Sequence, residues 1–237
     1  MAATGACASP TQRVGTGPAT TVCTGSDHGP NGISAPVFDA FMYPLEAVAL
    51  RRRRRRLIPR AAGSVLEVGV GTGANLPYYR WEQVDSLTMV DPTIPREVLE
   101  QTYPVPVLFH ALSVEDLPFP DAFFDSVVFT LVFCSVPDNR AGLREVTRVV
   151  KPGGQVLFIE HVLPPSTRLH AVMHAINPCW RRVSSGCNIT RKTDEELTAA
   201  GLYIREMERF GKGFLIAGQA TPSPPSEPRA GRGRGRG

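Results

Sequence analysis

Closely spaced cysteine pairs are absent from this chain. Its cysteines are Cys7, Cys23, Cys134, Cys179 and Cys187, and no two of them form a CxxC or CxxxC pair. An odd number of cysteines at irregular spacing argues against a disulfide framework and against a zinc knuckle. We therefore expect a reducing, intracellular setting and no metal site.

Long apolar runs are missing as well. No stretch approaches the roughly 20 apolar residues that a membrane-spanning helix needs. The first residues lack the basic-then-apolar plan of a secretory signal. They also lack the arginine enrichment of an organelle transit peptide, although their many hydroxyl side chains keep that as a minor alternative. We expect a soluble, cytoplasmic protein.

Basic charge spread evenly along the chain is also lacking. The formal net charge is +4, from 26 Lys and Arg against 22 Asp and Glu, and much of the positive charge lies in Arg51–Arg56 and in terminal Arg-Gly repeats. This distribution excludes a globally basic nucleic-acid clamp, so we expect no DNA contact and treat RNA contact by the tail as a weak alternative.

The run Arg51–Arg56 can attract the headgroups of an anionic membrane. Six consecutive positions encircle a helix, however, and cannot form one stripe. A solubilising helix end, with arginine stems lying over apolar surface, is therefore the simpler interpretation.

Composition divides the chain into three parts. Residues 1–36 are rich in Ala, Thr, Gly, Ser and Pro, and residues 221–237 form a low-complexity segment of Pro, Ser, Gly and Arg. Such segments bury too little apolar surface to fold, which predicts a disordered leader and a disordered tail. Residues 37–220 remain as one folded domain.

Strand-like apolar runs alternate with helical stretches inside this domain, a pattern typical of a parallel sheet covered by helices. After residue 190, one helix precedes two strands separated by Gly211-Lys212-Gly213, which predicts an antiparallel hairpin at a sheet edge. The fold class is α/β, a Rossmann-like, doubly wound, seven-stranded sheet that is mostly parallel. The other expected strands are 64–69, 86–91, 105–109, 124–131 and 155–160, and the expected helices include 43–60 and 139–150, the latter broken by Pro152-Gly153-Gly154.

A glycine-rich segment, Glu67-Val68-Gly69-Val70-Gly71-Thr72-Gly73, leaves the first predicted strand, and Ala74 and Asn75 are expected to open a helix. Glycines let the backbone turn sharply and approach a ligand, and a helix N-terminus offers free N–H groups. Asp91 ends the second strand, where a carboxylate can accept both hydroxyls of a ribose. A plain tight turn is the alternative for the glycines alone, but their spacing from Asp91 predicts a nucleoside cradle that fits a dinucleotide or S-adenosylmethionine.

The charge of Glu67 favours one of these two ligands. A carboxylate at this position is badly placed beside a diphosphate and well placed near a sulfonium and an α-amino group. The alternative is a glutamate that bonds to nearby backbone donors. The electrostatics therefore favour S-adenosylmethionine.

The segments VLEVGVGTGANLPYY, SVEDLPFPDAFFDSVV and REVTRVVKPGGQVLFIEHV resemble successive motifs of class I S-adenosylmethionine-dependent methyltransferases. The resemblance covers roughly residues 37–220 and lies in the branch of the ubiquinone and menaquinone C-methyltransferases. The stretch from FIEHV through NPCW to GCNITR is similar to methyltransferase-like thiol S-methyltransferases.

This resemblance implies S-adenosyl-L-methionine as the cofactor and assigns residues to its parts. Many relatives have Asp where Ser113 stands, and a serine hydroxyl is a weaker acceptor for the adenine amino group. The implied cofactor residues are Glu67, Gly69, Gly71 and Gly73 at the methionine half, Asp91 at the ribose, Ser113, Val114 and Glu115 at the adenine, and Thr130 and Leu131 closing over the cofactor.

Methyl transfer from a sulfonium relies on positioning, and a general base matters only for an acceptor that must lose a proton. His161, at the end of the fifth predicted strand, is the candidate catalytic base, with a strand-capping role as the alternative. Cys134 could be a nucleophile in principle, but direct methyl transfer needs no enzyme thiol, and we expect a small buried apolar residue. His170 and His174 share a helix face, but no third ligand at a convincing spacing supports a metal site.

The predicted function is methyl transfer to a small, apolar acceptor. A thiol is the first candidate, and a quinol or a phospholipid amine is next. Two other classes stay open: a nicotinamide-dependent oxidoreductase, although no Tyr-x-x-x-Lys pair is recognisable, and a non-catalytic protein that binds the cofactor or RNA.

Overall fold

The structure is a computed structural model that describes residues 50–184 and 186–222. The predicted leader, residues 1–36, lies outside the described residues, as does the part of the first predicted helix before Leu50. The last strand continues to Pro222, so the predicted tail boundary at residue 221 is two residues too early. The rest of that tail also lies outside the described residues.

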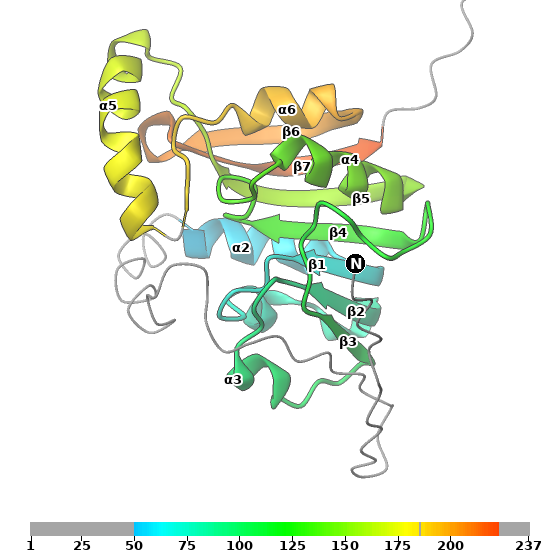
Figure 1. Cartoon of the computed structure of the whole chain (residues 1–237). Coiled ribbons are helices and arrows are strands. Elements are labelled where there is room, and N and C mark those ends of the chain that lie inside the picture. Colours follow the sequence, from blue (N-terminus) through cyan, green and yellow to red (C-terminus); the bar gives the residue numbers. More distant parts are fainter. Residues whose placement is uncertain (1–49, 185, 223–237) are drawn as a thin grey trace, which may run out of the picture.

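Seven strands form a single sheet in the order β3-β2-β1-β4-β5-β7-β6 (Figure 1). The first five pair in parallel, whereas β7 runs antiparallel to both β5 and β6. This arrangement confirms the predicted α/β fold and its edge hairpin, which turns at Gly211–Gly213. The strands are β1 (Gly63–Val68), β2 (Val84–Val90), β3 (Val107–His110), β4 (Phe124–Thr130), β5 (Val150–His161), β6 (Leu202–Phe210) and β7 (Leu215–Pro222).

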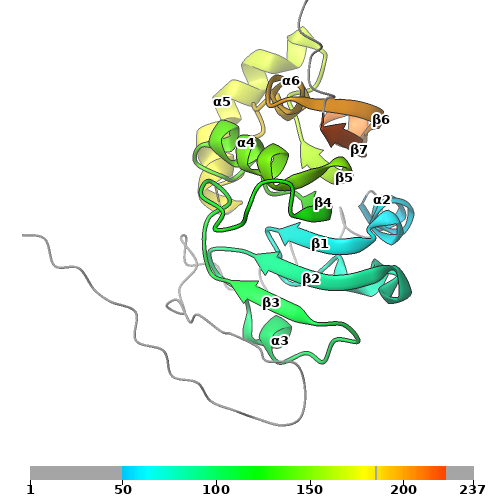
Figure 2. The same cartoon turned by 90° about the vertical axis from the view of Figure 1, so that its right-hand side faces the viewer.

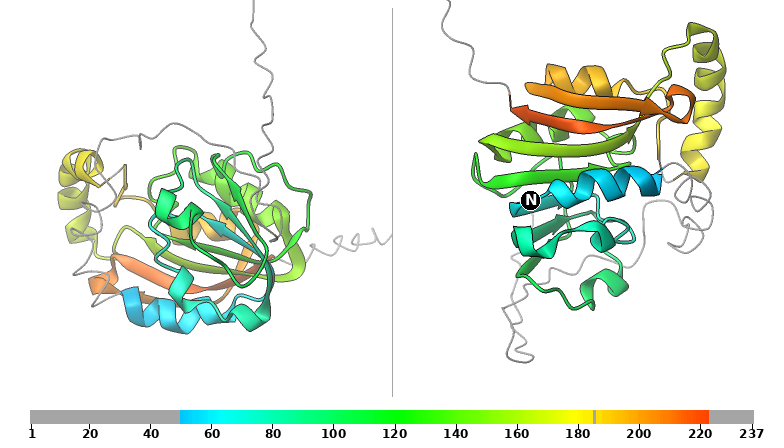
Figure 3. Two further views of the ribbon diagram at one scale, coloured as in Figure 1. Left: turned by 90° about the horizontal axis from the view of Figure 1, so that it is seen from below. Right: turned by 180° about the vertical axis from the view of Figure 1, so that it is seen from behind.

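Helices cover both faces of the sheet because its central strands are apolar on both sides. In β1, the last four residues are buried. Helix α2 (Arg51–Leu57) lies on one face, and α4 (Asn139–Val149) and α6 (Thr193–Ala199) lie on the other (Figures 2 and 3). The short α3 (Arg96–Leu99) follows β2.

Helix α5 (Thr167–Val183) has a different position from the other helices. It stands beyond the carboxyl ends of β4 and β5 rather than against a sheet face (Figure 1). Its 17 residues include Pro178. Among the described residues, no helix has the length and apolar character required to span a bilayer.

The segment Pro152-Gly153-Gly154 lies inside β5, which corrects the prediction that it precedes this strand. The α4 helix already ends at Val149, and the pairing of β4 with β5 shifts register between Phe124 and Ser126. Proline and glycine are tolerated at such a bulge because the ladder hydrogen bonds are interrupted there. Gly153 has a φ of +80°, a value that suits glycine.

The glycine-rich loop after β1 does not lead into an α-helix, so this part of the prediction is wrong. Residues 71–75 form turns, and a single 3₁₀ turn follows at Leu76–Tyr78. Pro77 lies in the first positions of this turn, where a missing backbone N–H costs nothing, and the turn ends because the backbone is extended again at Tyr79. The loop therefore lacks the helix N-terminus expected to face a ligand.

Candidate active site

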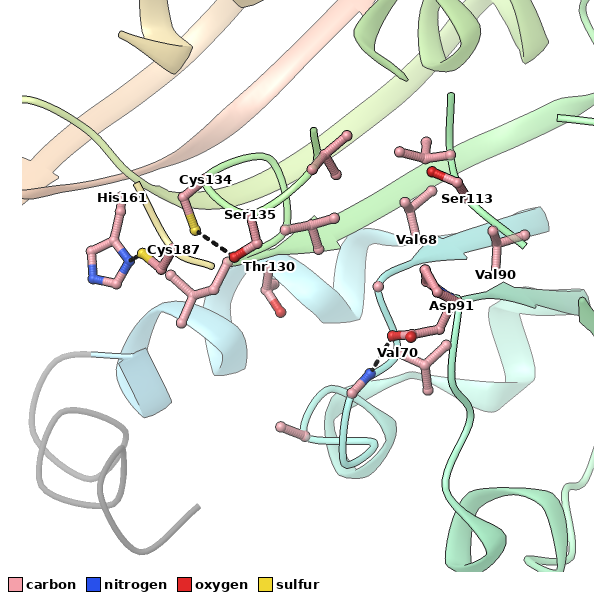
Figure 4. Close-up of a pocket in the computed structure, with 18 of the residues that line it drawn as sticks. Val68, Val70, Val90, Asp91, Ser113, Thr130, Cys134, Ser135, His161 and Cys187 are labelled. Atoms are coloured by element: carbon pink, nitrogen blue, oxygen red, sulfur yellow. Dashed lines mark hydrogen bonds between the residues drawn. The ribbon is translucent and has the colours of Figure 1, made fainter. Parts of the chain in front are cut away.

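A cavity of about 830 Å³ lies at the carboxyl ends of the central strands (Figure 4). Pockets of this size, largely apolar with a few polar groups, are typical of small-molecule sites. The sequence-predicted residues that line it are Gly69, Gly71, Asp91, Ser113, Val114, Glu115, Thr130, Leu131 and His161. Glu67 and Gly73, both within the described part of the chain, do not line it.

Asp91 lies at one end of the cavity, immediately after β2. Its carboxylate accepts hydrogen bonds from the backbone N–H of Gly71, at 3.0 Å, and of Thr93, at 2.9 Å. Burial raises the pKa of Asp91, and these two hydrogen bonds partly oppose the shift. Each carboxylate oxygen keeps a further lone pair, so the group can still accept from a ligand hydroxyl.

The glycines of the loop leave space where a side chain would otherwise stand. A Cβ on Gly69, whose φ is +70°, would lie 2.2 Å from Cγ2 of Val132. A Cβ on Gly71 would meet no atom within 4 Å, although this residue lines the cavity. The loop therefore needs glycine at Gly69 for packing, whereas Gly71 keeps the cavity floor open.

Glu67 is fully buried behind the loop, which corrects the expectation that its charge faces the ligand. Its two carboxylate oxygens accept from Asn75 Nδ2, at 3.0 Å, and from the hydroxyl of Tyr79, at 2.8 Å. Burial raises the pKa of Glu67 to about 7, although both hydrogen bonds and nearby Arg54 lower it. Glu67 therefore fits the alternative interpretation, a glutamate that bonds to nearby donors, except that its donors are side chains and not backbone N–H groups.

Arg54 is a cavity residue that the sequence interpretation missed. It is only 4% exposed, although it lies within a run of arginines. Its Nε donates to Asn75 Oδ1 at 2.9 Å, and its Nη2 lies 3.4 Å from Thr130 Oγ1. Leu50, Arg54 and Leu57 are all buried, and their helical spacing of four and three residues is the signal that could have placed Arg54 on the inner face of α2.

The remaining arginines of the run have different surroundings. Arg53 pairs with Glu208 at 2.8 Å and lies over the ring of Phe210, and Arg56 reaches the same carboxylate at 3.5 Å. Arg51, Arg52 and Arg55 are exposed.

Ser113 lies at the same end of the cavity as Asp91 (Figure 4), and it forms a hydrogen-bonded pair with Glu115, which also lines the cavity. The Ser113 hydroxyl donates to Glu115 Oε2 at 2.7 Å, and the other oxygen of Glu115 accepts from the N–H of Asp138. A hydroxyl that donates to a carboxylate becomes a better acceptor for another donor. Glu115 can therefore offset part of the weakness of serine at this position.

The segment after β4 turns sharply into the cavity. Leu131 has a φ of +58°, and its N–H donates to the carbonyl of Ile159 at 2.7 Å. A leucine in this region is strained, and strain of this kind concentrates at functional sites. Buried Glu160 holds the next residues because one of its carboxylate oxygens accepts from the N–H groups of Val132 and Phe133.

The opposite end of the cavity brings together Cys134, His161 and Cys187 (Figure 4). Their sulfur and ring nitrogen atoms lie within 4.8 Å of one another, and Nδ1 of His161 is 3.5 Å from Sγ of Cys187. The hydrogen bond from Cys134 and the nearby His161 lower the pKa of Cys187, despite burial. Cys134 is buried as expected, but it also lines the cavity.

His161 is the candidate base of the sequence analysis, and it does reach the cavity. Burial lowers its pKa, but the hydrogen bond to Cys187 and the nearby carboxylate of Glu160 raise the pKa above its ordinary value. His170, in contrast, bonds to the carbonyl of Pro164, and His174 is exposed on α5. Cys187 was not identified from the sequence as a site residue because it lies far along the chain from Cys134 and His161.

A sequence profile of the family described as "Methyltransferase domain" matches residues 66–158. Thiol S-methyltransferase TMT1B of Homo sapiens is 30% identical over 188 residues, which cover 73% of this chain and 77% of that protein. Thiol S-methyltransferase TMT1A of Homo sapiens is 34% identical over 62% of this chain and 63% of that protein. Phosphatidylethanolamine N-methyltransferase of Cereibacter sphaeroides is 33% identical over 53% of this chain and 64% of that protein.

This chain belongs to the S-adenosylmethionine-dependent methyltransferases. The chain spans just under two thirds of the length of the last two relatives. The methyltransferase fold is shared with the solved 1,6-didemethyltoxoflavin-N1-methyltransferase of Burkholderia thailandensis, which has 1,6-didemethyltoxoflavin and S-adenosylhomocysteine bound. That structure has a TM-score of 0.57 and 19% identity, and the match covers 78% of this chain and 83% of that chain.

The cavity of this methyltransferase fits its cofactor, S-adenosylmethionine. The open space above Gly71 gives room for a ligand against the backbone, and Asp91 presents carboxylate oxygens at the same place. Figure 4 shows Asp91 and Ser113 at one end of the cavity and the cysteine and histidine cluster at the other.

Proposed function

We propose that this methyltransferase methylates the sulfur of a small, apolar thiol. The observation that carries this proposal is the cavity end formed by Cys134, His161 and Cys187, two sulfur atoms and an imidazole with apolar surroundings. Thiols and thiolates are soft, polarizable groups that suit such surroundings. The two human relatives named thiol S-methyltransferases support the same acceptor.

The proposed cofactor contacts follow from the positions of the lining residues. Asp91 accepts from the ribose hydroxyls, and the segment Ser113–Glu115 faces the adenine. Gly69 and Gly71 lie along the methionine half, and Thr130 with Leu131 closes the cavity beside it. Glu67 and Gly73 lie behind the residues that line the cavity, and Glu67 acts indirectly by holding Asn75 in place.

S-adenosylmethionine supplies an electrophilic methyl group. The acceptor thiol would release its proton to solvent and its sulfur would take the methyl group, so that the cofactor would leave as neutral S-adenosylhomocysteine. The chain would contribute by holding the acceptor sulfur about 3–3.5 Å from the methyl carbon, in line with the bond that breaks, and by excluding water. No new anion forms, so no oxyanion hole is needed.

Isothermal titration calorimetry with S-adenosylhomocysteine tests the cofactor contacts. Asp91→Ala removes the acceptor of two ribose hydrogen bonds, and we expect the dissociation constant to rise at least about tenfold, since one hydrogen bond to a charged group contributes about 1.5–3 kcal/mol. Asp116→Ala is the matched control because Asp116 is exposed and lies outside the cavity wall. Equal affinity in both variants would refute the assignment of Asp91.

A labelled-methyl transfer assay tests the acceptor. We expect label in small apolar thiols, with the thioether identified by mass spectrometry, and little label in quinols or in phosphatidylethanolamine. Transfer to a quinol carbon or a lipid amine, with none to thiols, would overturn the thiol proposal while leaving the methyltransferase assignment intact.

A phospholipid amine is the second candidate acceptor. The relative from Cereibacter sphaeroides favours it, as do the exposed Arg51, Arg52 and Arg55, which can attract anionic headgroups. A triple Arg→Ser variant at these three positions avoids the paired Arg53 and the buried Arg54. If lipid is the acceptor, the native chain floats with anionic vesicles and the variant does not; equal flotation would count against this candidate.

A further inference from the structure

We propose that Cys134, His161 and Cys187 form a zinc site, with the sulfur of the acceptor thiol as the fourth ligand. This inference rests on the proposed thiol methylation, because the fourth position needs a sulfur acceptor. It also assigns His161 as a metal ligand in place of the general base expected from the sequence.

The geometry of the three side chains matches a tetrahedral zinc ion. Zn–S and Zn–N bonds of about 2.3 and 2.0 Å place tetrahedral sulfur and nitrogen ligands about 3.5 Å apart, and two sulfur ligands about 3.8 Å apart. Nδ1 of His161 lies 3.5 Å from Sγ of Cys187, and all three ligand atoms lie within 4.8 Å of one another. Shifts of about 1 Å or less therefore complete the site, a distance that side-chain rotation covers.

Three separate segments supply the ligands, and hydrogen bonds hold these segments together. The N–H of Cys134 points to Glu160, at 3.3 Å, next to His161 on β5. The N–H of Asn188, next to Cys187, donates to the carbonyl of Cys134 at 2.8 Å. These hydrogen bonds hold the three ligand residues close together in the folded chain.

The cavity leaves one coordination position accessible. All three residues line the same cavity as Asp91, so a ligand in that cavity can reach the cluster. Zinc sites with three protein ligands and one open position are typical of catalysis, and two cysteines with one histidine is a known ligand set of this kind. Structural zinc sites, in contrast, use four protein ligands.

A zinc ion at this position would allow the acceptor thiol to lose its proton before methylation. The acceptor thiol coordinates as its thiolate, and its proton passes to solvent, because a coordinated thiol is deprotonated. Zinc does not change oxidation state, so no electron donor or acceptor is needed. The product thioether is neutral and a weaker ligand than a thiolate, which allows it to leave.

Metal analysis of the intact chain tests the site directly. After incubation with Zn²⁺ and dialysis against metal-free buffer, we expect one zinc per chain by inductively coupled plasma mass spectrometry, and loss of that zinc in Cys187→Ser and in His161→Ala. Cys179→Ser is the matched control because Cys179 is an exposed free cysteine on α5. No retained zinc in the native chain, or equal zinc in native chain and ligand variants, would overturn the proposal.

Two further measurements separate loss of zinc binding from loss of folding, and test the fourth ligand without knowledge of the natural acceptor. Calorimetry with S-adenosylhomocysteine must give binding for each variant, which shows that its fold is intact. With Co²⁺ in place of Zn²⁺, sulfur-to-cobalt charge-transfer absorption should appear in the native chain and change when a small thiol is added. An unchanged spectrum would show that an added thiol does not bind the metal, and it would contradict the acceptor sulfur as the fourth ligand. Thiol methylation that continues undiminished after complete chelation would refute zinc catalysis while supporting the proposed function.

Discussion

Glu67 is the residue whose environment differs most from its expected role. The acidic residue of the loop does not face the cavity but is buried with Asn75 and Tyr79, near Arg54 and Asp91. Its effect on the ligand is therefore indirect, because Asn75 both bonds to Glu67 and lines the cavity. Burial makes the ionised form unfavourable in the folded chain.

We expect Glu67→Gln to alter the pH dependence of stability. The pKa of Glu67 is 4.5 unperturbed and about 7 in the folded chain, so the folded state binds more protons between these pH values and becomes less stable as pH rises. The glutamine variant lacks this slope, and its stability relative to the native chain should increase by up to roughly 3 kcal/mol between pH 4.5 and neutrality. Urea unfolding at several pH values measures this, and a difference that is independent of pH would contradict the buried-acid interpretation.

Gly69 and Gly71 should respond differently to alanine. Gly69→Ala places a Cβ against Val132 and should lower the unfolding free energy by about 1–3 kcal/mol. Gly71→Ala meets no such contact, so it should cost only about 1 kcal/mol for its positive φ while weakening binding of S-adenosylhomocysteine. Urea unfolding and calorimetry together separate the two effects. Equal stability losses would show that the two glycines do not have these distinct roles.

The sequence identified individual site residues where their role follows from their place in one strand or loop. Asp91 could be identified because it ends a strand at the edge where parallel strands place their ligands. Arg54 was hidden by the identical residues around it. Cys187 could not be paired with Cys134 and His161, because only the folded chain brings these distant segments together.

At the level of elements, apolar runs predicted the strands well because the central strands are buried on both faces. Element boundaries differ from the prediction at two places. The loop after β1 ends in a single 3₁₀ turn at Leu76–Tyr78, and Pro152 with two glycines forms a bulge inside β5 rather than a break before it. Both residue types interrupt regular hydrogen bonding, but the sequence does not tell whether a strand ends there or continues through a bulge.

The β6–β7 hairpin depends on Gly218, which pairs with Met207 and Phe158. A Cβ at Gly218 would lie 2.2 Å from the carbonyl oxygen of Glu206, next to the register shift in β6. Gly218→Ala should therefore push β6 from β7 and destabilise the chain by about 1–3 kcal/mol, with faster amide hydrogen exchange in β6.

Thr221→Ala is the matched control on the same strand. Its loss of a hydrogen bond with exposed Arg205 should change stability by no more than about 0.5 kcal/mol. Native-like exchange in β6 of the Gly218 variant would show that the hairpin tolerates the added methyl group.

At the scale of the whole molecule, the fold alone does not select the reaction, since one fold hosts many activities. The relatives show that the reaction is methyl transfer. The cavity divides into a polar end with Asp91 and Ser113 and a second end with two thiols and an imidazole. The two ends come from different halves of the sheet, β2 with the loop after β3, and β5 with the segment after α5.

A crystal structure with S-adenosylhomocysteine and a small apolar thiol tests this division most directly. We predict ribose hydroxyls on Asp91, adenine beside Ser113, and the cofactor sulfur directed toward Cys134, His161 and Cys187, with the acceptor sulfur between them. A cofactor bound in the reverse direction, or an acceptor sulfur bound away from this cluster, would contradict the proposed division of the cavity.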